Sequence, residues 1–101
     1  MGEIFIVKRI ILLILCHLLG DYVLQNDFIA KTKGSNWYHL FVHSALYCLP
    51  FMIFSVGFNT IDILLLFLAH MVIDPLKARY NMITYTQDQI LHYMVIAILA
   101  L

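Results

Sequence analysis

All five histidines of this 101-residue chain stand four positions from a second residue of a metal-ligating type. The spacing occurs four times, in the pairs His17/Asp21, His39/His43, His70/Asp74 and Asp88/His92. In an α-helix, residues four apart lie on one face about one turn from each other, so each pair can direct both side chains to the same point. Imidazole and carboxylate groups together suit zinc, iron or manganese. The spacing therefore predicts a metal site drawn from these eight residues.

Eight candidate ligands exceed the four that one tetrahedral zinc ion needs. Either two metal ions bind, or some of the residues orient the ligands and carry protons. The alternative is a metal-free network of hydrogen bonds between histidines and aspartates. We expect the bound ion to be a divalent transition metal, with zinc the first candidate and iron or manganese the next. The preferred ligands are His17, Asp21, His70, Asp74 and His92. The expected proton carrier is Asp88 or His43.

The composition indicates the environment of the chain. Hydrophobic residues make up 63% and charged residues 12%, whereas apolar usage in soluble domains is nearer half. A chain this short cannot bury so much apolar surface, so we expect an integral membrane protein with the lipid bilayer as its partner. The formal net charge of zero excludes a basic field for nucleic acid. Cys16 and Cys48 lie within apolar runs and predict buried thiols rather than a disulfide framework.

The apolar runs predict an all-α single domain over residues 1–101. Its four membrane spans are expected at about residues 4–25, 37–56, 61–79 and 86–101. A crossing needs about 20 residues, and the last run is shorter than that. Gly34 is expected to end the first helix, and Ser35 or Asn36 to cap the second. Thr60 is expected to cap the third helix, and residues 86–89 resemble a capping box for the fourth.

The four pairs lie late in the first and third spans and early in the second and fourth. In an up-down-up-down four-helix bundle with short loops, all four positions fall at one end. The topology and the spacing therefore support the same site. More basic residues lie at this end than at the other, namely Lys31, Lys33, Lys77 and Arg79 against Lys8 and Arg9. The positive-inside rule then places the site at the cytoplasmic face. Lys77 and Arg79 are either anchors at the headgroups or ligands for a phosphate or carboxylate.

These motifs resemble an uncharacterised family of small bacterial membrane proteins, known only as a domain of unknown function. The resemblance covers nearly the whole chain. It is carried by His17-Leu-Leu-Gly-Asp21-Tyr-Val-Leu-Gln25, His43 before a leucine-rich run, His70-x-x-x-Asp74 leading to Lys77-Ala-Arg79-Tyr80, and Asp88-Gln-x-x-His92. It implies a multi-pass protein of the bacterial inner (plasma) membrane and supplies no activity. The chain is more loosely similar to membrane-bound metal-dependent hydrolases, which also place His and Asp on transmembrane helices. That similarity rests on residue types alone.

Three functions suit such a site. The first is a metal-dependent hydrolase of a lipid or another membrane-proximal small molecule, because a metal lowers the pKa of bound water towards ~7. The second is a metal-stapled structural or partner-binding subunit, and a bundle this small can form a homodimer. The third is a metal-ion transporter, which the aliphatic far half of each span disfavours. We rank the hydrolase first, the structural subunit second and the transporter third.

Overall fold

A computed structural model describes residues 2–54 and 56–101 of the chain. These residues form five α-helices and one π-helical segment, and they include no β-strand. The helices are α1 (Gly2–Leu18), α2 (Asp27–Thr32), α3 (Trp37–Ile53), α4 (Thr60–Ala78) and α5 (Tyr85–Ala100), and the π-helical segment η1 (Leu19–Val23) continues α1. The all-α prediction is confirmed.

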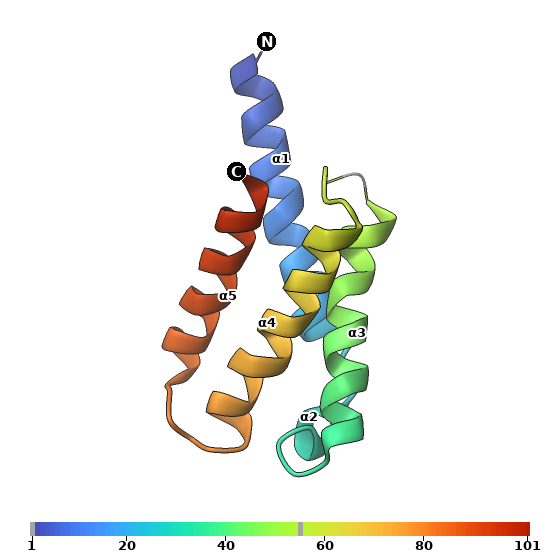
Figure 1. The fold of residues 1–101 in the computed structure, drawn as a ribbon, viewed down its shortest axis with the longest axis vertical. Helices are drawn as coiled ribbons and strands as arrows, with labels where there is room; N and C mark the ends of the chain where they lie inside the picture. The colour runs from blue at the N-terminus through green and yellow to red at the C-terminus, as the bar shows by residue number, and fades with distance from the viewer. Residues whose placement is uncertain (1, 55) are drawn as a thin grey trace.

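The four long helices pack side by side, and the short α2 lies at one end of them (Figure 1). α4 packs against both α3 and α5, while α3 also packs against α1, η1 and α2. The chain reverses direction from α3 to α4 and again from α4 to α5 (Figure 1). The end of α1, the start of α3, the end of α4 and the start of α5 therefore lie at the end of the molecule that α2 occupies.

Polar side chains fix the points at which the helices begin. Asn36 caps α3, as expected, by accepting hydrogen bonds from two backbone N–H groups of its first turn. α4 is capped by Asn59 and not by Thr60, and α5 by Thr84 and not by a box at residues 86–89. In both helices the residue three positions after the cap returns a side-chain hydrogen bond to the cap backbone. These reciprocal bonds explain why each helix begins slightly earlier than predicted.

The first predicted span, residues 4–25, is not one continuous α-helix, because α1 ends at Leu18 and η1 follows it. α1, α3 and α5 contain 17, 17 and 16 residues, fewer than the ~20 of a membrane crossing. α4 contains 19 residues but includes Asp62, Asp74 and Lys77. Within the described part of the chain, no helix combines the length and the apolar character that a crossing requires. This finding overturns the prediction of a multi-pass inner-membrane protein with its site at the cytoplasmic face.

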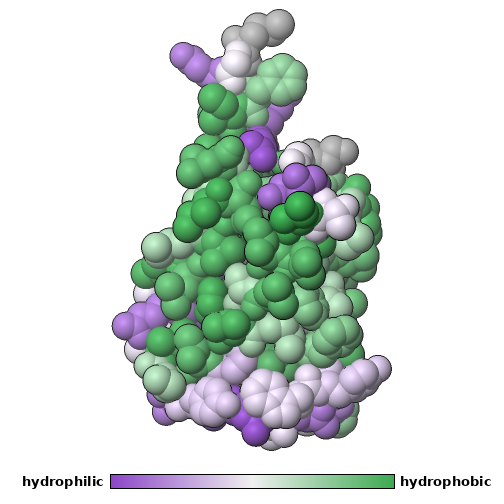
Figure 2. Space-filling view, in the orientation of Figure 1, coloured by the Kyte–Doolittle hydropathy of each residue, from purple (hydrophilic) through white to green (hydrophobic). Residues whose placement is uncertain are grey.

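Much of the apolar excess of the chain lies on the surface of the helices. Phe5 in α1, Met52 in α3, Val72 in α4 and Ile98 in α5 are each between 64% and 73% exposed. Figure 2 shows hydrophobic residues covering the middle of the visible face, with hydrophilic residues gathered towards its two ends. The 63% hydrophobic fraction therefore does not reflect an unusually large core.

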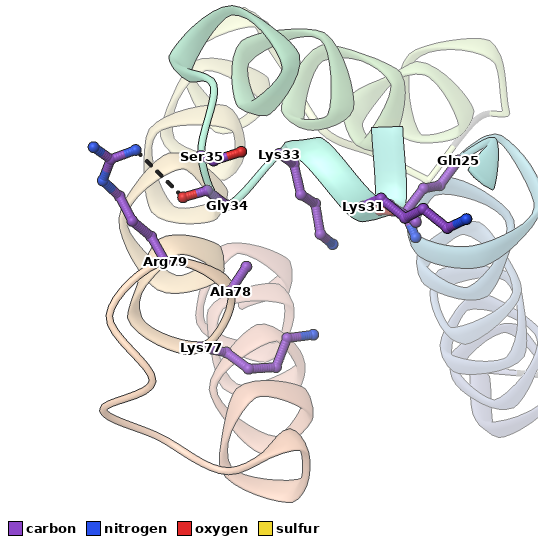
Figure 3. Close-up of a pocket in the computed structure, with 9 residues that line it drawn as sticks. Gln25, Lys31, Lys33, Gly34, Ser35, Lys77, Ala78 and Arg79 are labelled. Carbon is purple, nitrogen blue, oxygen red and sulfur yellow. Dashed lines mark hydrogen bonds between the residues drawn. The ribbon is translucent and has the colours of Figure 1, made fainter. Parts of the chain in front are cut away.

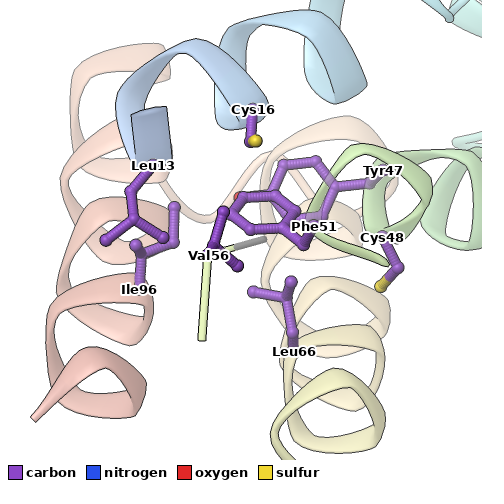
Figure 4. Packing of buried hydrophobic residues seen from close by; sticks show 8 residues of the cluster. All are labelled: Leu13, Cys16, Tyr47, Cys48, Phe51, Val56, Leu66 and Ile96. Carbon is purple, nitrogen blue, oxygen red and sulfur yellow. The ribbon is translucent and has the colours of Figure 1, made fainter. Parts of the chain in front are cut away.

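A small apolar core joins the long helices. It consists of Leu13, Cys16, Tyr47, Cys48, Phe51, Val56, Leu66 and Ile96 (Figure 4). Each of these side chains is at most 6% exposed. Cys16 and Cys48 are free thiols, as predicted, and burial raises the pKa of Cys48 to about 12. Tyr47 lies at the edge of this core, where its hydroxyl meets the polar residues described below.

The chain comes closest to itself where η1 crosses α3 at Gly20. A Cβ atom at this position would lie 2.6 Å from the carbonyl oxygen and 2.9 Å from the Cα of Tyr47. Both are backbone atoms, which cannot swing aside. The absence of a side chain at Gly20 therefore sets the distance between η1 and α3, and it brings the next residue, Asp21, towards the side chains of α3.

Candidate metal centre

Six polar side chains converge at the end of the molecule near α2. Their ligand atoms form two groups, and within each group the atoms lie within 4.8 Å of one another. The groups are Asp21, His43, His70 and Asp74, and Asp74, Asp88 and His92. We call these six residues the His/Asp cluster. Asp74 belongs to both groups. All six side chains are nearly withdrawn from solvent, with exposures between 0% and 7%.

The three imidazoles of the cluster direct their Nε2 atoms at carboxylate oxygens. Nε2 of His43 lies 3.3 Å, and Nε2 of His70 3.6 Å, from the same oxygen of Asp21. Nε2 of His92 lies 3.3 Å from Oδ1 of Asp88. The rings of His70 and His92 stack with their centroids 4.6 Å apart. Side chains from η1, α3, α4 and α5 therefore meet in one polar interior.

Four ligand atoms of the cluster have no hydrogen-bond partner among the described residues. They are His70 Nε2, Asp74 Oδ2, Asp88 Oδ1 and His92 Nε2. A buried polar atom without a partner costs about 1–3 kcal/mol, and a cation bound within either group would remove that cost for the atoms that it contacts. The far nitrogen of His70, Nδ1, lies 3.1 Å from Ser44 Oγ and is hydrogen-bonded to it. Metal-ligating histidines are commonly oriented by such a bond at the second nitrogen.

His17, a predicted ligand, lies beside the two groups rather than in them. Its Nδ1 is hydrogen-bonded to the Tyr47 hydroxyl at 2.7 Å, and its Nε2 to Gln89 Oε1 at 2.8 Å. The π-helical turn of η1 is wider than an α-helical turn, so His17 and Asp21 do not keep ideal four-residue stacking, and His17 Nε2 lies 3.9 Å from Asp21 Oδ2. Asp21 instead faces the imidazoles of α3 and α4, while His17 orders the residues around them.

His39, the other predicted ligand outside the groups, faces α2. It is hydrogen-bonded to the Thr32 hydroxyl, and its ring packs against Phe28 at 4.9 Å between centroids. Four residues advance an α-helix by about 6 Å. One member of the His39/His43 pair therefore reaches the interior, while the other remains at the end of α3.

Two lysines, neither predicted as a metal-site residue, contact the cluster. The Lys33 ammonium lies 3.2 Å from Oδ1 of Asp74 and 3.4 Å from Nε2 of His43. The Lys77 ammonium lies 3.5 Å from Oδ2 of Asp88. Asp88, the expected proton carrier, lies in the first turn of α5, and its side chain is fully buried. Lys33 follows α2, a helix that the sequence pattern did not predict, so its position could not have been foreseen.

Gln89 and Tyr47 also support the cluster and were missed from the sequence. The Gln89 amide donates hydrogen bonds to Asp21 at 3.0 Å and to Asp88 at 3.1 Å, so it links η1 to α5. Tyr47 follows His43 by four residues, the spacing that identified the ligand pairs. Extending that spacing to neutral polar residues would have included Tyr47.

A family model of proteins of unknown function, DUF3307, matches residues 10–101. The chain belongs to this family. The predicted resemblance to an uncharacterised family is confirmed at that level, while the match supports neither membrane attachment nor a relationship to hydrolases. All six cluster residues of this DUF3307 protein lie within the matched region. No curated protein and no solved structure matches the chain.

The environment of the DUF3307 cluster favours the protonation states that bind metal. Burial alone raises the pKa of the Asp21 carboxyl, but its contacts with His43, His70 and Gln89 hold that pKa well below its usual range. Burial lowers the pKa of His70 to about 4, against a smaller opposing effect of Asp21. At neutral pH the carboxylate is therefore ionised and the imidazole neutral, as metal ligation requires.

We expect the metal-free DUF3307 protein to lose stability as the pH falls from about 6.5 to 4. His70 titrates near 6.5 when unfolded and near 4 when folded, so the unfolded state binds more protons within this window. The difference corresponds to a free energy of unfolding that is about 3 kcal/mol lower at pH 4 than at pH 7. His17, whose pKa burial also lowers, acts in the same direction. Urea unfolding at pH 7, 5.5 and 4.5 measures the change.

The titratable groups around His70 are Asp21, His43, Asp74, His92 and Tyr47. The depressed pKa of Asp21 removes stability below its unfolded value of 3.8, outside this window. A His70→Gln variant should therefore show a flatter pH dependence than the wild type, whereas His39→Gln should not. Equal urea midpoints at pH 7 and 4.5 in the wild type would contradict the assignment.

Proposed function

We propose that this DUF3307 protein binds a divalent transition metal ion in the His/Asp cluster and uses it to hydrolyse a small molecule. The observation that carries the proposal is the set of four buried ligand atoms that lack a hydrogen-bond partner among the described residues. Zinc is the first candidate, with iron and manganese next, because the cluster offers imidazole nitrogens and carboxylate oxygens but no thiolate.

We assign different roles to the two overlapping groups of ligand atoms. Asp21, His43, His70 and Asp74 supply up to four ligands, which suffice for one ion. We assign proton transfer to Asp88, which lies 3.3 Å from His92 and is the only carboxylate of the cluster outside the first group. A metal ion bound here would polarise the scissile bond and lower the pKa of water.

The first experiment measures metal binding. Protein stripped by a chelator is titrated with Zn²⁺, Mn²⁺ or Fe²⁺, and bound metal and the thermal midpoint are recorded. We expect at least one tightly held ion per chain and a rise in unfolding free energy of about 3 kcal/mol at a free-ion concentration 100-fold above Kd. His70→Gln should lose this effect. His39→Gln, which removes an imidazole outside the cluster, should retain it.

The second measurement separates an enzyme from a metal-stapled scaffold. Carboxylic ester, amide and phosphoester substrates are offered to the metal-loaded wild type and to Asp88→Asn. We expect the variant to keep its metal and lose turnover. A metal-dependent rise in the thermal midpoint without turnover of any substrate would indicate that the metal has a structural role. A wild type that holds no metal and shows no change in midpoint would instead favour the hydrogen-bond network.

A further inference from the structure

An open pocket of about 570 Å³ lies beside the cluster, between the end of α2 and the end of α4 (Figure 3). Its volume is in the range of small-molecule sites. The cationic side chains that line it are Lys31, Lys33, Lys77 and Arg79. The residues that form its wall within the described chain include no aspartate or glutamate. A pocket with this lining attracts an anionic ligand.

Lys33 and Lys77 connect the pocket to the cluster. Figure 3 shows both ammonium groups projecting into the same opening, Lys33 from the end of α2 and Lys77 from α4. The same two groups contact Asp74 at 3.2 Å and Asp88 at 3.5 Å. A molecule held by these lysines would therefore lie next to the candidate metal ligands.

The rim of the pocket is held by contacts between the segment that follows α2 and the end of α4. Gly34 packs so closely on the Ala78 carbonyl that a side chain at this glycine would collide with it. The Arg79 guanidinium donates a hydrogen bond to the Gly34 carbonyl at 3.3 Å and lies over the Trp37 ring at 4.3 Å. These contacts keep the two lysines on facing walls. They also place the single tryptophan of the chain against Arg79, which lines the pocket, so that its fluorescence can report binding.

We propose that this pocket binds the phosphate group of a small phosphoester substrate, with Lys33 and Lys77 as its principal ligands. The inference rests on the proposed hydrolase and names the class of its substrate. A phosphate monoester carries close to two negative charges and three strong acceptor oxygens, so it can engage both ammonium groups at once. A carboxylate carries one charge and two oxygens, and it matches the four cations less well.

Metal and phosphate binding are coupled in this arrangement. An ion bound at the unpartnered Oδ2 of Asp74 would draw negative charge from the carboxylate whose Oδ1 lies 3.2 Å from the Lys33 ammonium. Metal loading therefore weakens the attraction between Asp74 and Lys33, so that Lys33 can engage an anion in the pocket and phosphate binds more tightly. By reciprocity, phosphate increases the affinity for the metal by the same factor.

The test titrates phenyl phosphate, inorganic phosphate and benzoate into metal-free protein and into metal-loaded Asp88→Asn protein, which should bind the ester without hydrolysing it, and follows binding by calorimetry and Trp37 fluorescence. Phenyl phosphate and benzoate share a ring and differ in the anion. We expect phenyl phosphate to bind at least tenfold more tightly than benzoate, and more tightly with metal than without. Tighter binding of the ester than of inorganic phosphate identifies a substrate pocket rather than a site for the free ion.

Lys77→Met should weaken phenyl phosphate binding by about tenfold to a hundredfold, since it removes a charge-assisted bond. Its metal affinity should stay equal or increase, which structural damage would not produce. Lys77→Arg should retain binding. Lys8→Met removes an exposed cation from the first half of α1, at the far end of the molecule (Figure 1), and should behave as wild type.

The outcomes separate the two proposals. Metal binding without preference for phosphate over benzoate, or equal effects of Lys77→Met and Lys8→Met, overturns the phosphate pocket and leaves the metal centre standing. If the protein holds no metal, the proposed hydrolase fails. The titration of the metal-free protein then tests the phosphate pocket on its own. Phenyl phosphate binding by the wild type that is lost in Lys77→Met supports the pocket, whereas a wild type that does not bind phenyl phosphate overturns it.

Discussion

We expect the Asp74→Asn protein to bind zinc at least about a hundredfold more weakly than the wild type. Asp74 is the one residue shared by both groups of ligand atoms, so its neutralisation affects each of them. Loss of an outer-shell partner alone already costs 10–100-fold in metal affinity, and a direct ligand contributes more. The amide also accepts a weaker hydrogen bond from Lys33, which lies 3.2 Å from Asp74. Zinc titration with a chromophoric competitor measures the affinity.

Asp27→Asn is the matched control, because Asp27 is an exposed aspartate at the start of α2. It makes the same chemical change outside the cluster and should leave zinc affinity unchanged. Thermal unfolding of the metal-free variants establishes that Asp74→Asn is folded. A folded Asp74→Asn protein with wild-type zinc affinity would exclude the cluster as the metal site.

The Gly20→Ala variant should be less stable than the wild type by about 2 kcal/mol or more. Replacing glycine by alanine within a helix usually gains about 0.5–1 kcal/mol. Here the added Cβ would lie 2.6 Å from a backbone oxygen of Tyr47, and overpacking of this kind costs about 1–3 kcal/mol or more. The collision with rigid backbone therefore outweighs the gain in helix propensity. It also pushes Asp21 away from His43, so zinc affinity should fall as well.

Gly2→Ala is the control for this prediction, because nothing lies within 4 Å of a Cβ at Gly2. We expect this variant to be as stable as the wild type or slightly more so. Thermal midpoints compare the three proteins, and a loss of 2 kcal/mol corresponds to roughly 10 °C for a domain of this size. Equal midpoints for the two variants would show that η1 and α3 can separate at Gly20 without cost.

The four-residue spacing was a good guide where the helix is regular. His70 and Asp74, and Asp88 and His92, lie within α4 and α5, and each pair reaches the cluster as the α-helical repeat predicts. The spacing failed for His17, because the chain becomes π-helical directly after it. Gly20, within this π-helical segment, packs directly on the backbone of α3, and a periodicity argument along the chain does not include that contact.

Composition was the weaker guide. The hydrophobic fraction of 63% predicted membrane spans, but it counts residues without regard to where each helix stops. The first run is divided at Leu18, and α4 combines its 19 residues with three charged side chains. Helix ends are set by caps such as Asn59 and Thr84 and by packing between helices. A sum of apolar residues includes neither.

The sequence by itself determined that the chain is helical and which residue types could ligate a metal, because helix periodicity and ligand chemistry are local properties. It also placed the pairs at alternating ends of successive helices, which is sufficient for most of them to meet. The tertiary structure alone decided that His17 and His39 remain outside the cluster and that Asp74 joins its two halves. It also decided that Lys33 and Lys77 line a cationic pocket and at the same time contact the carboxylates of Asp74 and Asp88. These are contacts between residues far apart in the chain, fixed by how closely the helices approach, and no local pattern encodes that distance.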